Sequence, residues 1–319
     1  MMGAAVSGLW IPHVRAQSEY PSKPVRMVVP YATGQSADIF GRMVALQLGE
    51  IWPRATVVDN RGGGAGIPGM LAGRDAEPDG HTFVLGGSGT MAINPGLYGD
   101  KLPYDPIKDF TAVHGLFLAP LIVLAHPDSG IETFQQLIER AKVKPGAEQW
   151  GVAGLGTSPY LAGEMIKSAA GVNITAVPYR GSGHMLNDLL GGQIKLGVDT
   201  VSASINYVTE GRLRALAVTS RERLPQLPDT PTVAELGYPD FEAVGWAGFF
   251  VPAKTSADHA AAIEAALRKA MSTKAMQDGI TQRGALVDMR GGKEFGAFVN
   301  AELDKWGAII AANEIKVNE

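Results

Sequence analysis

The segment VRMVVPYATGQSADIFGR, residues 25–42, sets a pattern that the rest of the chain repeats. It opens with an apolar run typical of a buried strand, continues through a loop of small and polar residues, and then spaces its apolar residues as a helix does. Ser36 is a favourable N-cap for this helix, and Asp38 lies in its first turn. We therefore predict a strand, a loop and a helix in direct succession.

Five further segments have the same arrangement. They are ATVVDNRGGGAGIPGM (55–70), HTFVLGGSGTMAINPGLY (81–98), WGVAGLGTSPYLAGEMIK (150–167), ITAVPYRGSGHMLNDLL (174–190) and KLGVDTVSASINYV (195–208). Each helix start leaves backbone N–H groups unpaired and carries the positive end of the helix dipole, so it can bind an anion. Several such junctions facing one crevice would form a binding site for a small, negatively charged molecule.

Two apolar strands interrupt this alternation. LFLAPLIVLAHP (116–127) leads into a second unit, and EAVGWAGFFVPAK (242–254) crosses back before two amphipathic helices, at about 256–278 and 293–312. We predict an α/β fold of two doubly wound α/β/α lobes joined by two crossing strands, with the ligand outside the carboxyl ends of the strands. Lobe 1 would comprise residues 21–120 and 252–319, and lobe 2 residues 121–251.

Composition narrows the class of protein. The chain has 319 residues, a net charge of −4 and no basic run, so we expect no nucleic-acid partner. The absence of Cys excludes disulfides and thiol nucleophiles, and suits an oxidising compartment. Residues 1–16 resemble the tail of a secretory signal peptide cleaved after Ala16, although a positively charged start is missing; the alternative is a disordered N-terminus. No later stretch reaches the ~20 apolar residues of a membrane span.

The sequence gives less support to an enzyme or to a bound cofactor than to a binding site for an anion. Gly64-x-Gly66-x-x-Gly69 follows a strand, but the acidic residue that a dinucleotide site needs after the next strand is missing, so a tight structural turn is favoured. The six His residues lack metal-ligand spacing, and we expect neither a metal nor a cofactor. The alternative function is a serine hydrolase of the α/β type that uses Ser88, although Gly87-Ser88-Gly89 is not a complete nucleophile elbow.

Nine motifs in register carry a family resemblance. They are VPYATGQSADIFGR, VVDNRGGGAGIPG, DGHTFVLGGSGTMAINPGLY, KLPYDPIKDF, GLGTSPYLAGE, VPYRGSG, LLGGQIKLGVDT, LRALAVTS and LPDTPTVAELGYPDFEA. Together they resemble the periplasmic solute-binding receptors of tripartite tricarboxylate transporters, often called Bug-type receptors, over nearly all of residues 20–315. The resemblance implies a type II periplasmic-binding fold that closes like a Venus flytrap. It also implies a periplasmic, non-enzymatic receptor, expected to be a monomer, that binds an organic di- or tricarboxylate between its two lobes and hands it to integral membrane components.

The resemblance also implies a ligand site of loop backbone, hydroxyls and water. The residues concerned are Tyr31, Thr33, Gln35, Ser36, Ser88, Gly89, Thr90, Gly156, Thr157, Ser158 and Asp199. Thr33-Gly34-Gln35 departs from the Pro-Gly-Gly that is usual in the family, which frees a backbone N–H and adds an amide. We expect the hydroxyls of Ser88, Thr90, Thr157 and Ser158 to donate to ligand carboxylates. One group would surround Ser88 to Thr90 and the other Gly156 to Ser158, each holding one end of a diacid.

Two further expectations concern Asp199 and the aromatic residues. Asp199 ends an apolar strand, where it either organises the neighbouring loops, which we favour, or contacts the ligand directly. Tyr31, Tyr160 and Trp246 are candidates to enclose an aromatic ring, since the small neighbours of Trp246 leave its ring room to stand clear. A terephthalate-like diacid is therefore expected to bind more tightly than citrate or benzoate.

Overall fold

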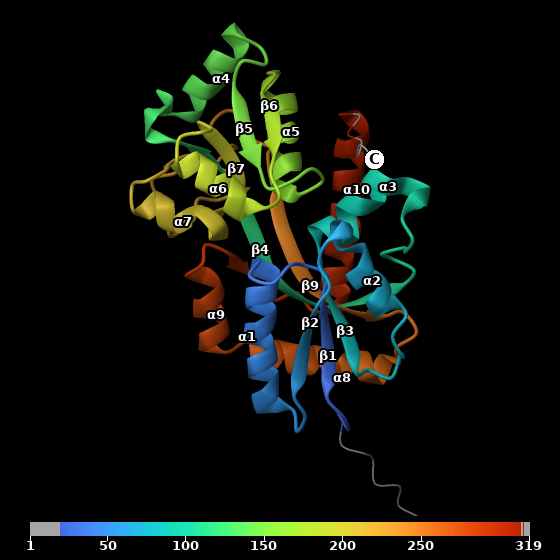
Figure 1. The fold of residues 1–319 in the computed structure, drawn as a ribbon. Helices are drawn as coiled ribbons and strands as arrows, with labels where there is room; N and C mark the ends of the chain where they lie inside the picture. Colours follow the sequence, from blue (N-terminus) through green and yellow to red (C-terminus); the bar gives the residue numbers. More distant parts are fainter. Residues whose placement is uncertain (1–19, 314, 316–319) are drawn as a thin grey trace, which may run out of the picture.

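The longest strand, β4 (Phe110–Ala125), connects the two halves of a mixed sheet that has ten strands in the described residues (Figure 1). The structure is a computed structural model that describes residues 20–313 and 315, so the predicted signal segment lies outside the described residues. Up to Pro120, β4 pairs with β9 (Val244–Pro252), and from Leu121 onward it pairs with β7 (Leu196–Thr200) and β8 (Arg214–Val218). One continuous apolar strand thus belongs to both halves.

The first half contains the N-terminal junctions and the C-terminal helices. Its strand order is β2-β1-β3-β9-β4, and the strands besides β9 and β4 are β1 (Val25–Val29), β2 (Thr56–Asn60), β3 (Thr82–Gly87) and β10 (Leu286–Val287), which pairs with β4. Around this sheet lie α1 (Ser36–Ile51), η1 (Gly64–Gly66), α2 (Ile67–Arg74), η2 (Ser88–Ile93), α3 (Asn94–Tyr98), η3 (Gly99–Lys101), α8 (Ala257–Met271), α9 (Lys274–Thr281) and α10 (Gly292–Ala312). Alternate residues of β1 enter different apolar clusters, with Met27 on the α1 and α8 side and Val28 on the α2 and α10 side, as expected of a sheet covered on both faces.

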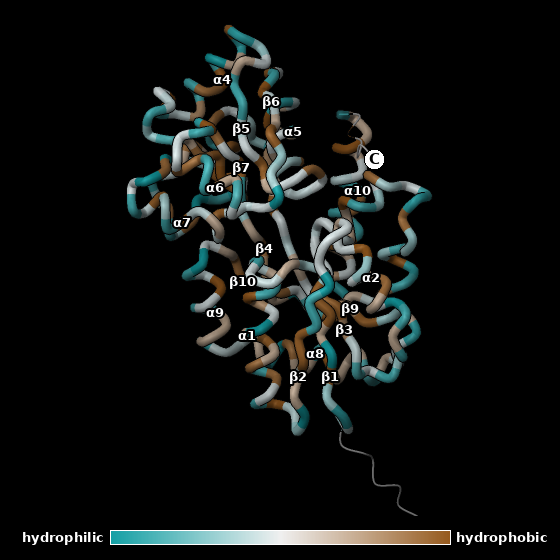
Figure 2. The backbone as a smooth tube through the Cα atoms, in the orientation of Figure 1, coloured by the Kyte–Doolittle hydropathy of each residue, from teal (hydrophilic) through white to brown (hydrophobic). Residues whose placement is uncertain are grey.

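The second half likewise consists of strands covered by helices, and β7 lies inside its sheet. Its order is β4-β7-β5-β6, with β5 (Gln149–Val152) and β6 (Thr175–Pro178) parallel to each other. Its helices are η4 (Pro127–Ser129), α4 (Phe134–Val143), α5 (Ser158–Ala170), α6 (Ser182–Leu190) and α7 (Val201–Thr209). Hydrophobic segments gather at the centre of each half, and hydrophilic ones lie toward the outer helices (Figure 2).

The predicted fold class agrees with this architecture, and one predicted helix differs in detail. The single helix expected at 256–278 is two helices, because the Thr273 hydroxyl accepts a hydrogen bond from Met276 N–H and starts α9 anew. The division into lobes stays a prediction. Since β9 pairs with β3 of the first half from Val84 to Gly87, we propose to draw the second lobe boundary before Val244 rather than after Val251.

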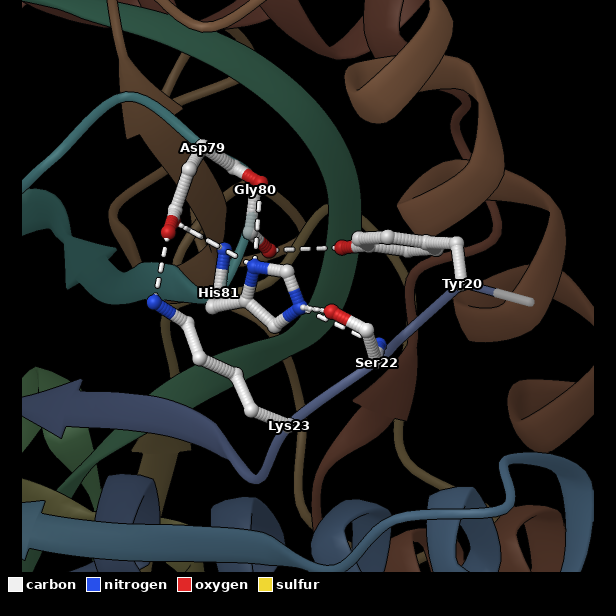
Figure 3. A network of polar contacts seen from close by, with 6 residues as sticks. All are labelled: Tyr20, Ser22, Lys23, Asp79, Gly80 and His81. Carbon is white, nitrogen blue, oxygen red and sulfur yellow. Dashed lines mark hydrogen bonds and ion pairs between the residues drawn. The ribbon is translucent and has the colours of Figure 1, made fainter. Parts of the chain in front are cut away.

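The start of the described chain is held at the end of lobe 1 shown at the bottom of Figure 1. The Tyr20 hydroxyl donates to the Gly80 carbonyl at 2.6 Å, and Lys23 pairs with Asp79 at 2.8 Å. His81 Nε2 accepts a hydrogen bond from the Ser22 N–H at 3.3 Å (Figure 3). These contacts fix the beginning of β1 against the loop that precedes β3. Within the described residues, no helix is long and apolar enough to cross a membrane.

Candidate ligand-binding site

Two pairs of serine hydroxyls join helix starts of the two halves. Ser88, the first residue of η2, lies with its Oγ 2.8 Å from Oγ of Ser158, the first residue of α5. Ser36 at the start of α1 lies with its Oγ 3.0 Å from Oγ of Ser202 in the first turn of α7. We call these contacts the 88–158 junction and the 36–202 junction. At each of them a helix N-terminus from one half meets one from the other.

The 88–158 junction is closely packed. Ser88 is buried, and a side chain at Gly156 would meet Leu97 Cδ1 of α3 at 2.7 Å. Gly156 also has a φ of +72°, which favours glycine. The groups around Ser88 to Thr90 and Gly156 to Ser158 therefore meet at one place. The expectation that they hold opposite ends of a diacid is wrong, because a hydrogen bond already joins them.

Two of the four predicted donor hydroxyls are committed to the loops themselves. Thr90 Oγ1 accepts from the Gly87 N–H at 3.1 Å and lies 3.3 Å from the Gly87 carbonyl. Thr157 Oγ1 donates to the Gly154 carbonyl at 2.7 Å and caps the N–H of Tyr160. Both threonines thus stabilise helix starts, which corrects their expected role as ligand donors. Gly89 is half-buried, with open space where a side chain would begin.

The first binding loop is organised by Asp38, which the sequence indicated only as an acid in the first turn of a helix. Asp38 is 2% exposed, and its carboxylate accepts hydrogen bonds from Gly34 N–H at 2.8 Å and from Asn60 Nδ2 at 2.9 Å. It also pairs with Arg42. Burial alone would raise the pKa of Asp38, but the hydrogen bonds from Arg42, Gly34 and Asn60 outweigh it and lower the pKa below its usual value. The carboxylate thereby stays ionised and holds the turn at Gly34.

The other residues predicted in this loop differ in exposure. Thr33 and Gln35 are exposed, and Gln35 is the N-cap residue of α1 without a side-chain capping bond. Tyr31 is half-buried, and its hydroxyl lies close enough to Gly87 that a side chain there would meet it at 2.5 Å. Burial raises the pKa of Tyr31 to about 12, although a hydrogen bond with Thr90 lowers it in part. Tyr31 therefore links the first loop to the start of η2.

Asp199 is fully buried at the end of β7. Its Oδ1 accepts hydrogen bonds from Ser182 Oγ at 2.7 Å and from Thr200 N–H at 2.8 Å, whereas Oδ2 has no partner among the described residues. Burial is the main cause that raises the pKa of Asp199 to about 6, against the opposing effect of these two hydrogen bonds. The bonds are those of a loop organiser, and contact with a ligand stays a prediction.

The aromatic residues divide into a core residue and two half-buried ones. Trp246 is 3% exposed, its ring packs edge-on against Phe295 and Phe298, and its indole N–H donates to buried Glu302 at 3.0 Å. The expectation that its ring stands clear is wrong, because α10 covers this face of β9. Tyr160 is half-buried against the core, and burial, followed by the charge of Glu164, raises its pKa.

Sequence reasoning did not single out Ser182 and Ser202. Both lie in the first turn of a predicted helix after a strand, and this position was the available signal. Ser202 Oγ also lies 3.3 Å from Thr200 Oγ1, so a chain of polar contacts runs from Asp199 through Thr200 to the 36–202 junction. The contact of Ser202 with Ser36 joins parts of the chain far apart in sequence, which local patterns do not reveal.

The geometry around Ser88 does not resemble a hydrolase. The Ser88 hydroxyl is bonded to Ser158, and His81 lies just before β3, at the end of that strand opposite Ser88, where its ring contacts Ser22 and Asp79. Two of the three glycines of the G-x-G-x-x-G motif lie against protein atoms, and a side chain at Gly66 would meet Thr90 Cγ2 at 2.7 Å. A side chain at Gly69 would meet Pro30 at 2.6 Å, which agrees with a structural tight turn.

A family model, a curated relative and two solved structures relate the chain to one group. The TctC family model, described as "Tripartite tricarboxylate transporter family receptor", matches residues 40–315. The protein BugT of Bordetella pertussis is 29% identical over 299 residues, which are 93% of this chain and 91% of BugT. Among solved structures, Rpa4515 of R. palustris with adipate is 30% identical, with a TM-score of 0.86 over 94% of this chain and 100% of that one. MatC from Rhodopseudomonas palustris with bound malate is 28% identical, with a TM-score of 0.81 over 91% of this chain and 100% of that one.

Proposed function

The chain belongs to the TctC family of tripartite tricarboxylate transporter receptors, and from this premise we propose that it is a periplasmic receptor for a dicarboxylate. The ligand binds between the two lobes, and the membrane components of the transporter then recognise the closed receptor. The type II periplasmic-binding fold predicted from sequence is confirmed by the solved relatives, which include the periplasmic binding protein BugD. Chemistry on the ligand forms no part of this proposal.

One observation carries the proposal: hydroxyls from both halves meet in pairs at the 88–158 and 36–202 junctions. Within each pair one hydroxyl donates to the other, which leaves one free O–H donor beside helix N-termini that already favour an anion. Two separate junctions suit a ligand with two anionic groups, one for each junction. A ligand that binds residues of both lobes binds the closed form more tightly than the open form and shifts the population toward it.

The ligand class is narrower than carboxylates in general. Adipate is bound in one structural relative and malate in another, and both are dicarboxylates. With Trp246 in the core, the aromatic faces left for a ring are those of Tyr31 and Tyr160. We keep terephthalate as the aromatic member of the proposed class, beside the aliphatic diacids.

A ligand screen by thermal shift tests the proposal directly. We expect diacids such as adipate, malate or terephthalate to raise the melting temperature, since a ligand at ~100 times its Kd adds about 2.7 kcal/mol to the free energy of unfolding. Benzoate and hexanoate, which carry one carboxylate, should give smaller shifts because one junction has no anion to bind. If no diacid of a broad panel produces a shift or a calorimetric signal, the dicarboxylate proposal is wrong.

Closure can be tested by a disulfide at the 36–202 junction. The chain has no Cys, and the two Oγ atoms are 3.0 Å apart, so Ser36→Cys combined with Ser202→Cys should form a disulfide of ~2 Å S–S length after a small adjustment. We expect the reduced double variant to show a smaller radius of gyration in small-angle scattering when a bound diacid is added, and the oxidised form to show no change.

Ligand exchange provides the second readout of this double variant. The oxidised form should take up ligand much more slowly than the reduced form, because the lobes cannot separate. The two single Cys variants are the controls, and each should take up ligand at the same rate before and after treatment with the same oxidant. Equal uptake rates for the oxidised and reduced double variant would show that ligand entry needs no opening at this junction.

A further inference from the structure

Asp199 is a buried acidic residue without a charged partner among the described residues, which is unusual in a receptor that is proposed to bind anions. Its side chain is 0% exposed, and it makes no ion pair in the described part of the chain. Its Oδ1 is saturated by Ser182 and Thr200, while its Oδ2 is buried and has no hydrogen-bond partner in residues 20–313 and 315. A buried carboxylate oxygen without a donor is costly. The arrangement therefore destabilises the ionised form of Asp199 relative to an exposed carboxylate, and Oδ2 is the oxygen free to take a proton.

The position of Asp199 links it to the proposed ligand site. Thr200 follows it directly, and the Thr200 hydroxyl contacts Ser202, whose own hydroxyl makes the 36–202 junction. A ligand carboxylate bound at this junction would bring a second negative charge toward Asp199. Two carboxylates at close range do not both stay ionised, because their repulsion in a buried site raises one pKa strongly. One proton shared at the site relieves this repulsion.

We propose that Asp199 takes up one proton from solvent when the receptor binds a dicarboxylate, because the charge of the bound ligand disfavours the ionised form of this buried side chain further. This inference rests on the proposed function, since it needs an anionic ligand at the 36–202 junction. It makes Asp199 a specificity residue for carboxylate ligands. The proton balance is simple: one H⁺ leaves the buffer for each ligand bound, and no covalent bond between heavy atoms changes.

Few ionisable side chains surround Asp199 on the described elements that pack against β7. The strand segments paired with β7, Leu121–Ala125 of β4 and Trp150–Val152 of β5, have no ionisable side chain. Ionisable residues on the three helices packed against β7 are Tyr160, Glu164 and Lys167 of α5, His184 and Asp188 of α6, and Tyr207 of α7. Glu164 pairs with Lys167, and Asp188 accepts from Tyr179. His184 is exposed.

The pKa of Asp199 places this uptake near neutral pH. With a pKa raised by burial to about 6, most molecules without ligand are ionised at about pH 7 and above. Ligand binding then draws in up to one proton, and affinity should fall by up to tenfold per pH unit from about pH 7 to pH 8. Below about pH 5 the acid is already protonated, so binding should take up almost no proton at this residue.

Calorimetry in two buffers of different ionisation enthalpy measures the uptake. With adipate and malate as probes at about pH 7.5, we expect the wild type to take up nearly one proton per ligand and Asp199→Asn to take up none. The Asn amide keeps a donor and an acceptor, so this variant should still bind. Asp229→Asn, which changes an exposed carboxylate of the same lobe, is the matched control and should behave as the wild type.

The outcomes separate the two proposals. Binding without proton uptake in the wild type, or with the same uptake in Asp199→Asn, overturns this inference and leaves the proposed function intact. Absence of binding to every diacid overturns the proposed function itself.

Melting curves without ligand test the raised pKa of Asp199. Because the pKa of Asp199 is higher in the folded state, the free energy of unfolding falls as pH rises from about 4 to about 6, and Asp199→Asn should remove that loss. Equal pH profiles for the variant and the wild type would contradict a raised pKa.

Discussion

Replacing Ser36 and Ser88 together by alanine is expected to weaken dicarboxylate binding by about two to four powers of ten. Each serine belongs to a different junction, so the double variant removes one donor from each end of the ligand. A hydrogen bond to a charged group is worth about 1.5–3 kcal/mol, and every ~1.4 kcal/mol is a tenfold change in Kd. The two losses should add, provided the junctions hold different carboxylates.

Titration calorimetry of the two single variants and the double variant measures this effect. Each single variant should lose one to two powers of ten in affinity. The melting temperature without ligand should change little, because a contact between two neutral hydroxyls contributes only about 0.5–1.5 kcal/mol. Ser168→Ala, an exposed change on α5, is the control. An affinity within threefold of the wild type in the double variant would mean that the two junctions are not the ligand site.

The helices that follow strands could be predicted because the sequence signals for them lie close together in the chain. Six strand-loop-helix segments in the sequence correspond to β1–α1, β2–α2, β3–η2–α3, β5–α5, β6–α6 and β7–α7. Apolar periodicity, N-cap residues and glycine loops all lie within some fifteen residues of each other, so single-sequence reasoning detects them. The two apolar strands outside this pattern are β4 and β9, which pair antiparallel along most of their length.

The pairing of the loops was harder to predict because it depends on contacts between distant segments. Ser88 and Ser158 were both identified, but the 2.8 Å contact between them was not, since nothing local to either residue indicates its partner. For the threonines the reason is different. Each threonine lies three residues after a glycine whose backbone its hydroxyl can reach. The hydroxyl therefore bonds to that local backbone group and is not available to a ligand.

Trp246 shows the limit of reasoning from neighbours in the sequence. Gly245, Ala247 and Gly248 do leave space beside its ring, and that space is filled from elsewhere in the chain. A side chain at Gly248 would meet Phe295 at 2.2 Å, so the glycine admits a ring of α10 and leaves no room for a ligand. Small residues in a strand predict a close approach, but they do not identify what approaches.

Trp306→Ala is expected to lower the free energy of unfolding by about 3–5 kcal/mol, the usual cost of removing a buried large aromatic side chain. Trp306 is 0% exposed on α10, and its indole N–H donates to Glu302 Oε2 at 2.9 Å. The same oxygen accepts the indole N–H of Trp246 at 3.0 Å, and Lys305 pairs with the other oxygen. One buried carboxylate thus joins α10 to β9, and the truncation leaves both a cavity and a weakened polar network.

Urea denaturation of three variants separates these contributions. Trp306→Phe keeps one aromatic ring in the core but loses the N–H and part of the indole, so it should cost roughly 1–3 kcal/mol, below the alanine variant. Leu46→Ala, at a side chain 69% exposed, should stay within about 0.5 kcal/mol of the wild type. Because Trp306 lies in the core and the serine junctions lie at helix starts, Trp306→Phe should retain the diacid affinity of the wild type. If the phenylalanine variant is as unstable as the alanine variant, the hydrogen bond to Glu302, and not the packing of the ring, accounts for the loss in the free energy of unfolding.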